Sequence, residues 1–265
     1  MIPVSQVQGG ALAAKGIQRV NPREPHMAQP MKLSFTQDVT ETSPAKREAV
    51  GALRITADGR KFRYAKAGTA ALTAGTMGQA PTAVANHCNL TGTIAAVGDR
   101  VLTVTVGATA VTENSYEDGF LQVTATDGTG RQYRVLSNTA CAASGSLVLT
   151  LAEGLRAAVA SNAKLSLVPS PWCGVTASAT EENLPAGVTP CNVPAGHYYF
   201  AQTGGVGCCL SAGTLAVGTM LVPGATAGSL AAMNATLDVD QPVAGVSFAI
   251  AGTDGSCSPC FLTID

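Results

Sequence analysis

The chain has 265 residues, enough for two ordinary domains or one large all-β domain. Charged residues make up 12% of it, against roughly 25% in typical globular proteins, while hydrophobic residues make up 46%, which excludes wholesale disorder. The formal net charge of −1 gives no nucleic-acid-binding signature, and no segment reads as membrane-spanning.

Residues 1–50 are rich in proline and show no sustained hydrophobic period, which predicts an extended N-terminal arm. Residues 1–66 hold eleven Lys and Arg against five Asp and Glu, whereas the rest of the chain is acidic. Such an arm becomes ordered by binding a partner or, alternatively, by folding back on its own domain. The expected apolar anchors are Ile17, Val20, Leu33 and Phe35, and the expected charge contacts are Arg19, Arg23, Lys32, Lys46 and Arg47.

Residues 51–172 are expected to form a β-rich middle module. Asp58-Gly59 between residues 53–56 and 61–64 is a strong hairpin signal. Short strands separated by frequent turn residues predict a small barrel or sandwich. Further strands are expected at 91–97, 100–106, 120–126, 131–136, 147–151 and 165–168, with a short helix at 155–160.

Residues 173–265 are expected to form a C-terminal β-barrel module, with strands at 198–202, 215–221, 243–251 and 260–264. Glycine at this density suits tight barrel corners. No Lys or Arg follows Lys164, and residues 183–237 carry no charged side chain at all. Because a solitary protein usually keeps a charged surface, we expect this stretch to pack against copies of the same chain. A neutral-surfaced single β domain is the alternative.

The search for catalytic chemistry finds no motif. Three histidines are present, but none belongs to a hydrolase, metalloprotease, phosphate-binding or dinucleotide-binding pattern. His87 precedes Cys88, a weak hint of a catalytic dyad, because dyad partners are usually distant in sequence. We therefore expect no enzymatic activity, no catalytic residue and no cofactor.

The cysteines leave three alternatives open. Cys208-Cys209 is a vicinal pair, and Cys257 and Cys260 have C-x-x-C spacing. They are expected to be buried or free thiols, with a disulfide or a metal site as the alternatives. We predict no metal, because vicinal cysteines on a strand point to opposite faces. The absence of a secretory signal predicts synthesis in a cytoplasm, where thiols stay reduced.

Two stretches resemble a known family. Residues 51–68 (GALRITADGRKFRYAKAG) and 194–226 (PAGHYYFAQTGGVGCCLSAGTLAVGTMLVPGAT) are similar to head decoration, or cement, proteins of tailed bacteriophages. The second stretch has an aromatic strand ending in Gln-Thr, a glycine turn, then G-x-L-x-x-G and Val-Pro. The closing residues 261–265 also fit. The resemblance covers about residues 31–265, while the paired cysteines and residues 1–30 depart from it.

The resemblance implies a capsid decoration protein on the outside of the virion, made in the host cytoplasm. It would bridge major capsid protein subunits and stabilise the assembled head, with the arm as its anchor. Its expected partners are the major capsid protein and copies of itself, a trimer rather than a dimer. The alternatives are another virion structural protein (tail, adaptor or fibre component) and, further off, a carbohydrate-binding or depolymerase β module.

Overall fold

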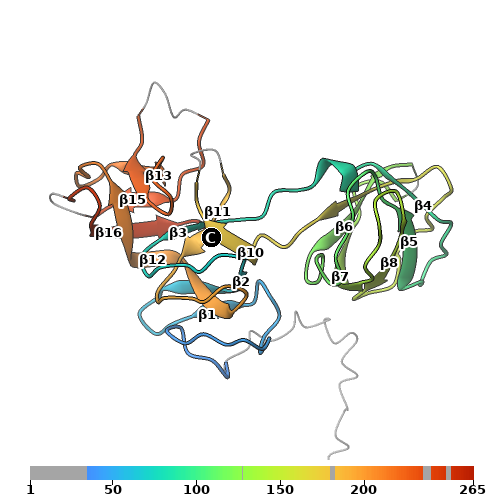
Figure 1. Cartoon of the computed structure of the whole chain (residues 1–265), viewed down its shortest axis with the longest axis horizontal. Helices are drawn as coiled ribbons and strands as arrows, with labels where there is room; N and C mark the ends of the chain where they lie inside the picture. Colours follow the sequence, from blue (N-terminus) through green and yellow to red (C-terminus); the bar gives the residue numbers. More distant parts are fainter. Residues whose placement is uncertain (1–34, 127, 180–182, 235–239, 249–251) are drawn as a thin grey trace, which may run out of the picture. The chain divides into compact units, whose positions relative to one another are not determined.

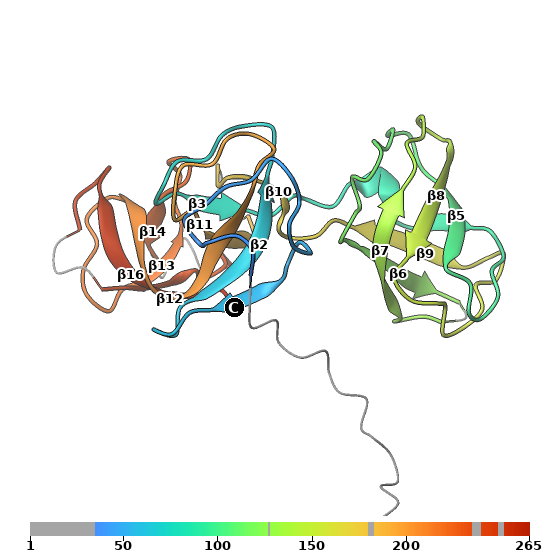
Figure 2. The same cartoon turned by 90° about the horizontal axis from the view of Figure 1, so that it is seen from below.

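In the computed structural model the described residues are 35–126, 128–179, 183–234, 240–248 and 252–265. They belong to one compact unit. Apart from a short 3-10 turn at Ala85–His87, the regular elements of these residues are β-strands, which confirms the predicted all-β class. The strands form a ten-stranded sheet and a closed six-stranded barrel (Figures 1 and 2).

The first part of the ten-stranded sheet closes on itself. The long strand β12 pairs with β2 at one end of a row of strands and with β11 at its other end. Residues 198–204 of β12 pair with β2, and Gln202 of β12 also pairs with Val188 of β11. We call this closed series the first ring. It contains β2 (Lys61–Ala67), β10 (Cys173–Ala177), β3 (Met77–Gln79), β11 (Pro185–Val188) and β12 (Tyr198–Ala212), and β1 (Leu53–Ile55) pairs with β2.

The second part closes in the same way on the other half of β12. Gly204 to Leu210 pair with β16, and Ser211 and Ala212 pair in parallel with β14. Gly205 lies where β12 passes between the rings: its φ is +83°, and a Cβ there would lie 3.1 Å from the Cα of Arg60. This second ring contains β12, β16 (Cys257–Thr263), β15 (Gly245–Ser247), β13 (Met220–Pro223) and β14 (Leu230–Ala232).

The closed six-stranded barrel is inserted in the chain between β3 and β10. Alternate residues of its strands point inward, so Leu147, Leu149 and Leu151 of one strand are all buried in a single core. The barrel order is β4 (Leu90–Gly92), β5 (Val101–Thr105), β8 (Ser146–Leu151), β7 (Gln132–Asn138), β6 (Phe120–Ala125) and β9 (Lys164–Val168).

The strands do not group at the expected boundary between residues 172 and 173. The hairpin of β1 and β2 and the strand β3 belong to the same sheet as β10 to β16, and only residues 85–168 form the separate barrel. Turn residues reveal neighbouring strands, but they carry no information on partners as distant as β2 and β12. The predicted boundary is therefore wrong, although the predicted small barrels are present.

Most predicted strands are present, with changed lengths. The hairpins around residues 58–59 and 127–130 are confirmed by the pairing of β1 with β2 and of β6 with β7. The predicted helix at 155–160 is wrong: Leu155 is buried in the barrel core, and Val159 bridges Ala95 in extended conformation. Of the predicted strand 215–221, only residues 220 and 221 fall in β13; β15 lies within the predicted strand 243–251, of which residues 249–251 lie outside the described residues. The strands β3, β10, β11 and β14 were not predicted.

Residues 35–52 cover one face of the first ring. Side chains alternate between the two faces of β2. Ala65 and Ala67 point into the core inside the ring, and Phe62 and Tyr64 point into a second core cluster on its outer face. Phe35, Val39, Val50 and Ala52 of the segment pack against this outer cluster. The fold-back alternative therefore holds for residues 35–50, and the expected arm boundary at residue 50 is wrong.

Candidate interaction surfaces

Four apolar side chains form a continuous row across the outer face of the second ring. Val206 of β12 lies opposite Phe261 of β16, which in turn lies opposite Val246 of β15. Val246 lies opposite Met220 of β13. Directly opposed residues share one face of a sheet, and Val206, Phe261 and Met220 are 51%, 48% and 53% exposed. We call these four residues the apolar row.

One exposed apolar residue extends the row. Phe248 follows β15 and is 61% exposed, and its N–H donates to the carbonyl of Pro259 in β16. Val217, just before β13, is also 60% exposed, but no strand pairing places it in the row. Single exposed apolar residues are normal on protein surfaces, but contiguous ones mark an interaction surface.

A surface hollow of about 750 Å³ adjoins the row at Val206 and Phe261. Its other walls carry charge, from Arg60, Lys61 and Asp265 among others. The hydrogen bond from the Arg63 guanidinium holds the pKa of the Asp265 carboxyl below its ordinary value despite partial burial. The hollow thus brings apolar side chains of the row next to charged ones, of which Arg60 is paired with Asp58.

Of the nine predicted arm contacts, three lie in the described residues. Phe35 packs edge-on against Phe200, with ring centroids 5.4 Å apart. The backbone N–H of Arg47 donates to the hydroxyl of Tyr64 at 3.1 Å, while the Arg47 side chain stays exposed. These residues contact the chain's own first ring. The other six, Ile17, Arg19, Val20, Arg23, Lys32 and Leu33, lie outside the described residues.

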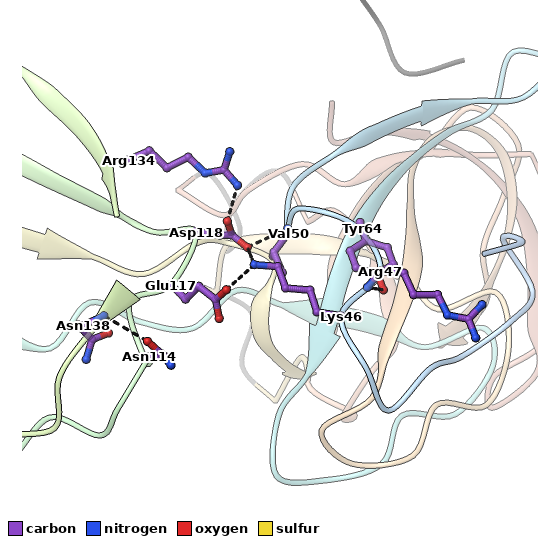
Figure 3. A network of polar contacts seen from close by, with 9 residues as sticks. All are labelled: Lys46, Arg47, Val50, Tyr64, Asn114, Glu117, Asp118, Arg134 and Asn138. Atoms are coloured by element: carbon purple, nitrogen blue, oxygen red, sulfur yellow. Dashed lines mark hydrogen bonds and ion pairs between the residues drawn. The ribbon is translucent and has the colours of Figure 1, made fainter. Parts of the chain in front are cut away.

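Lys46 belongs to a polar network centred on Asp118 of the inserted barrel (Figure 3). Its ammonium lies 2.5 Å from Asp118 and 2.6 Å from Glu117. Asp118 also accepts hydrogen bonds from the N–H of Val50, at 3.0 Å, and from the Arg134 guanidinium. Burial disfavours the charged carboxylate, but the hydrogen bonds outweigh it and lower the pKa of Asp118. The network joins the segment 46–50 to the barrel.

The His87 side chain is engaged in structural hydrogen bonds. It is buried, with Nε2 3.0 Å from the carbonyl of Thr109 and Nδ1 2.6 Å from the hydroxyl of Tyr116. Because a carbonyl oxygen only accepts, Nε2 donates to Thr109, and Nδ1 shares the other hydrogen bond with the Tyr116 hydroxyl. Burial raises the pKa of Tyr116 to about 12. The Cys88 thiol donates instead to the carbonyl of Val84, so these neighbours form no dyad.

The cysteines and the aromatic strand follow the expected alternation. Cys208 is exposed and Cys209 is buried, and Cys257 and Cys260 divide in the same way. Within the part of the chain that the structure describes, no group of three or more His, Cys, Asp and Glu side chains could hold a metal ion. Tyr198 and Phe200 lie in one core cluster and Tyr199 in the other, so they offer no stacking platform for a sugar.

Comparison of the chain with protein families, curated proteins and solved structures finds no match. A search of the described residues finds no helix long and apolar enough to cross a membrane.

The apolar row was not predicted residue by residue. The sequence pattern that could have revealed it is the alternation in β16. Cys260 and Leu262 point inward, so the aromatic Phe261 between them points outward. The charge-free stretch 183–237 contains Val206 and Met220, but only the strand register brings them and Val246 beside Phe261.

Proposed function

We propose that this chain is a structural protein of a tailed-bacteriophage head, a decoration protein that binds the outside of the assembled shell. The observation that carries the proposal is the apolar row with its flanking residue Phe248. They form an exposed, uncharged face on a module whose sequence has no Lys or Arg. An exposed apolar face of this kind is typical of a surface that another protein covers.

The two stretches that resemble decoration proteins lie side by side in the fold. Tyr198 pairs with Lys66 and Phe200 with Tyr64, so the second stretch forms the strand next to the first. Their similarity to one family therefore belongs to a single structural unit, the first ring and the strand it shares with the second. The resemblance is therefore to one folded unit, which supports it more than two unconnected sequence matches would.

The proposed mechanism is mechanical. Burying a half-exposed Val, Met or Phe side chain contributes on the order of 1 kcal/mol, so the apolar row supplies a few kcal/mol per copy. Such a contribution is small for two free molecules, which lose translational and rotational freedom on binding. A shell offers many repeated sites, and a protein that binds only the assembled shell stabilises it by mass action. Copies of this chain and the major capsid protein are the proposed partners.

The anchoring arm is proposed for residues 1–34 alone, because residues 35–50 cover the first ring. That stretch holds Lys15, Arg19, Arg23 and Lys32 against a single acidic residue, Glu24. Basic side chains at the edge of an interface mainly accelerate association and are screened by salt. Apolar and backbone contacts would then hold the bound state.

Co-sedimentation with expanded heads of the phage that encodes the chain tests the proposal. We expect the wild-type chain to pellet with heads and Phe261→Lys to bind at least tenfold more weakly, since about 1.4 kcal/mol corresponds to tenfold in affinity. Leu136→Lys is the matched control, because Leu136 is a 45% exposed apolar residue in β7 of the inserted barrel. Both variants must keep the wild-type circular dichroism spectrum. Failure of the wild-type chain to bind heads would refute the proposal.

A further inference from the structure

Two pairs of cysteines lie on the two faces of one strand ladder. Cys208 of β12 is opposite Pro259 of β16, which makes Cys257 its diagonal neighbour. Cys209 is opposite Ser258, and its diagonal neighbour is Cys260, displaced in the other direction along β16. When each pair is viewed from its own face of the sheet, both diagonals slant in the same direction. The right-handed twist of the strands therefore brings the two cysteines of each pair closer together on both faces.

The side chains meet along both diagonals. Cys208 and Cys257 line the same surface hollow, and Cys209 and Cys260 lie in the same buried core cluster. The first thiol pair is exposed and the second is buried in the core of the second ring. Each cysteine is a free thiol in this structure. The ladder therefore holds two preformed dithiols that differ in access to solvent.

The exposed pair lies at a surface hollow of about 490 Å³, which Cys208, Cys257, Gly75 and Arg60 line among others. Gly75 leaves the room that Cys257 needs, because a Cβ at this position would lie 2.7 Å from the Cys257 Sγ. The positive φ of +80° at Gly75 also favours glycine. A small oxidant can thus reach the exposed pair without any opening of the ring.

We propose that Cys208 and Cys257 form an oxidation site that closes into a cross-strand disulfide and links β16 covalently to β12. With a small disulfide such as oxidised glutathione, one cysteine thiolate attacks a glutathione sulfur, forming a mixed disulfide and releasing one glutathione thiolate. The second cysteine thiolate attacks the protein sulfur of that mixed disulfide and releases the second glutathione. Two electrons pass from the cysteine pair to the oxidant, and the two thiol protons end on the two glutathione molecules.

The surroundings of the two pairs set the order of oxidation. Burial, followed by the neighbouring Cys257 thiol, raises the pKa of Cys208, so little thiolate is present at neutral pH and the reaction is slow. Cys209 and Cys260 are fully buried, so they react only when the ring opens. In the phage, this oxidation would follow when particles leave the reducing cytoplasm for an oxidising medium. That timing rests on the proposed function, whereas the chemistry does not.

The test uses the free full-length chain and oxidised glutathione, and it counts thiols by alkylation and mass spectrometry. We expect the eight free thiols of the chain to fall by two under native conditions, with full recovery after reduction. Cyanogen bromide cleavage at Met220 and Met233 separates β12 from β16. The fragments should stay joined until reduction, and the thermal midpoint of the oxidised chain should rise.

Single variants distinguish the proposed pair from other outcomes. Cys257→Ser should stop at a glutathione adduct on Cys208, whereas Cys260→Ser should still form the cross-strand bond. No loss of thiols, a stable adduct on the wild-type chain, or a bond between Cys208 and Cys209 would each overturn the proposal. Since no capsid is involved, a failure here leaves the proposed function standing, and failure of head binding leaves this chemistry standing.

Discussion

Asp118 is the position where a single substitution tests the link between the inserted barrel and the segment 46–50. The Asp118 side chain is 3% exposed, whereas its partners Lys46 and Arg134 are 28% and 40% exposed. Removing the carboxylate by Asp118→Ala leaves the buried N–H of Val50 without its acceptor, which costs about 1–3 kcal/mol. The two ion pairs are screened by solvent, so each adds at most about 1 kcal/mol.

Asp118→Asn is the matched variant, because it keeps an oxygen acceptor for Val50 and loses only the charge. Asn also tolerates the positive φ of 61° at this position, while Ala pays roughly 1–2 kcal/mol for it. We therefore expect a loss of about 1–2 kcal/mol in the free energy of unfolding for Asn and about 3–5 kcal/mol for Ala. Urea denaturation at pH 7, followed by the fluorescence of Trp172, measures both.

The pH dependence follows from the lowered pKa of Asp118. The carboxylate contributes its stabilisation above the unfolded pKa of about 3.9 and loses it as the pH falls through the lower folded value. The difference in unfolding free energy between wild type and Asp118→Asn should therefore shrink as the pH drops below about 4. Equal losses for Asn and Ala, or a loss below about 0.5 kcal/mol for both, would refute the role assigned to the Val50 hydrogen bond.

Three further changes have definite expected outcomes. Tyr199→Phe should raise the free energy of unfolding by about 1 kcal/mol, because the buried Tyr199 hydroxyl has no hydrogen-bond partner among the described residues; urea denaturation measures it, and a loss would contradict the reasoning. Gly205→Ala should lower it by about 1–3 kcal/mol, since its φ is +83° and the new Cβ would crowd Arg60; an unchanged midpoint would contradict this. Removal of residues 1–34 should preserve the thermal midpoint and weaken head binding. Removal of residues 1–47 should also lower the midpoint, because it uncovers Phe200. An unchanged midpoint in the longer truncation would contradict the packing of residues 35–47.

The elements that the sequence predicted well are those set by local chemistry. Asp58-Gly59 fixes the β1–β2 hairpin, and the alternation in residues 147–151 fixes which side chains of β8 enter the core. The long strand β12 was predicted only for residues 198–202, because Gly204 and Gly205 look like a turn. In the fold they let one strand pass from the first ring to the second.

The candidate surface needed information that no local pattern contains. The charge-free stretch predicted an interface in the C-terminal module, but Phe261 joins Val206 and Val246 only through the register of three strands. Conversely, Lys46 and Arg47 looked like free basic residues of an arm, and the fold engages Lys46 with Asp118, far along the chain. Such long-range pairs follow from tertiary packing and from no periodicity in the sequence.

The central claim is that the apolar row is an assembly surface. A cryo-electron microscopy reconstruction of heads decorated with the full-length chain, at a resolution that shows side chains, tests it most directly. The account predicts that Val206, Phe261, Val246 and Met220 are covered by the major capsid protein or by another copy of this chain. A reconstruction in which this face of the second ring points into solvent at every capsid site would contradict the account.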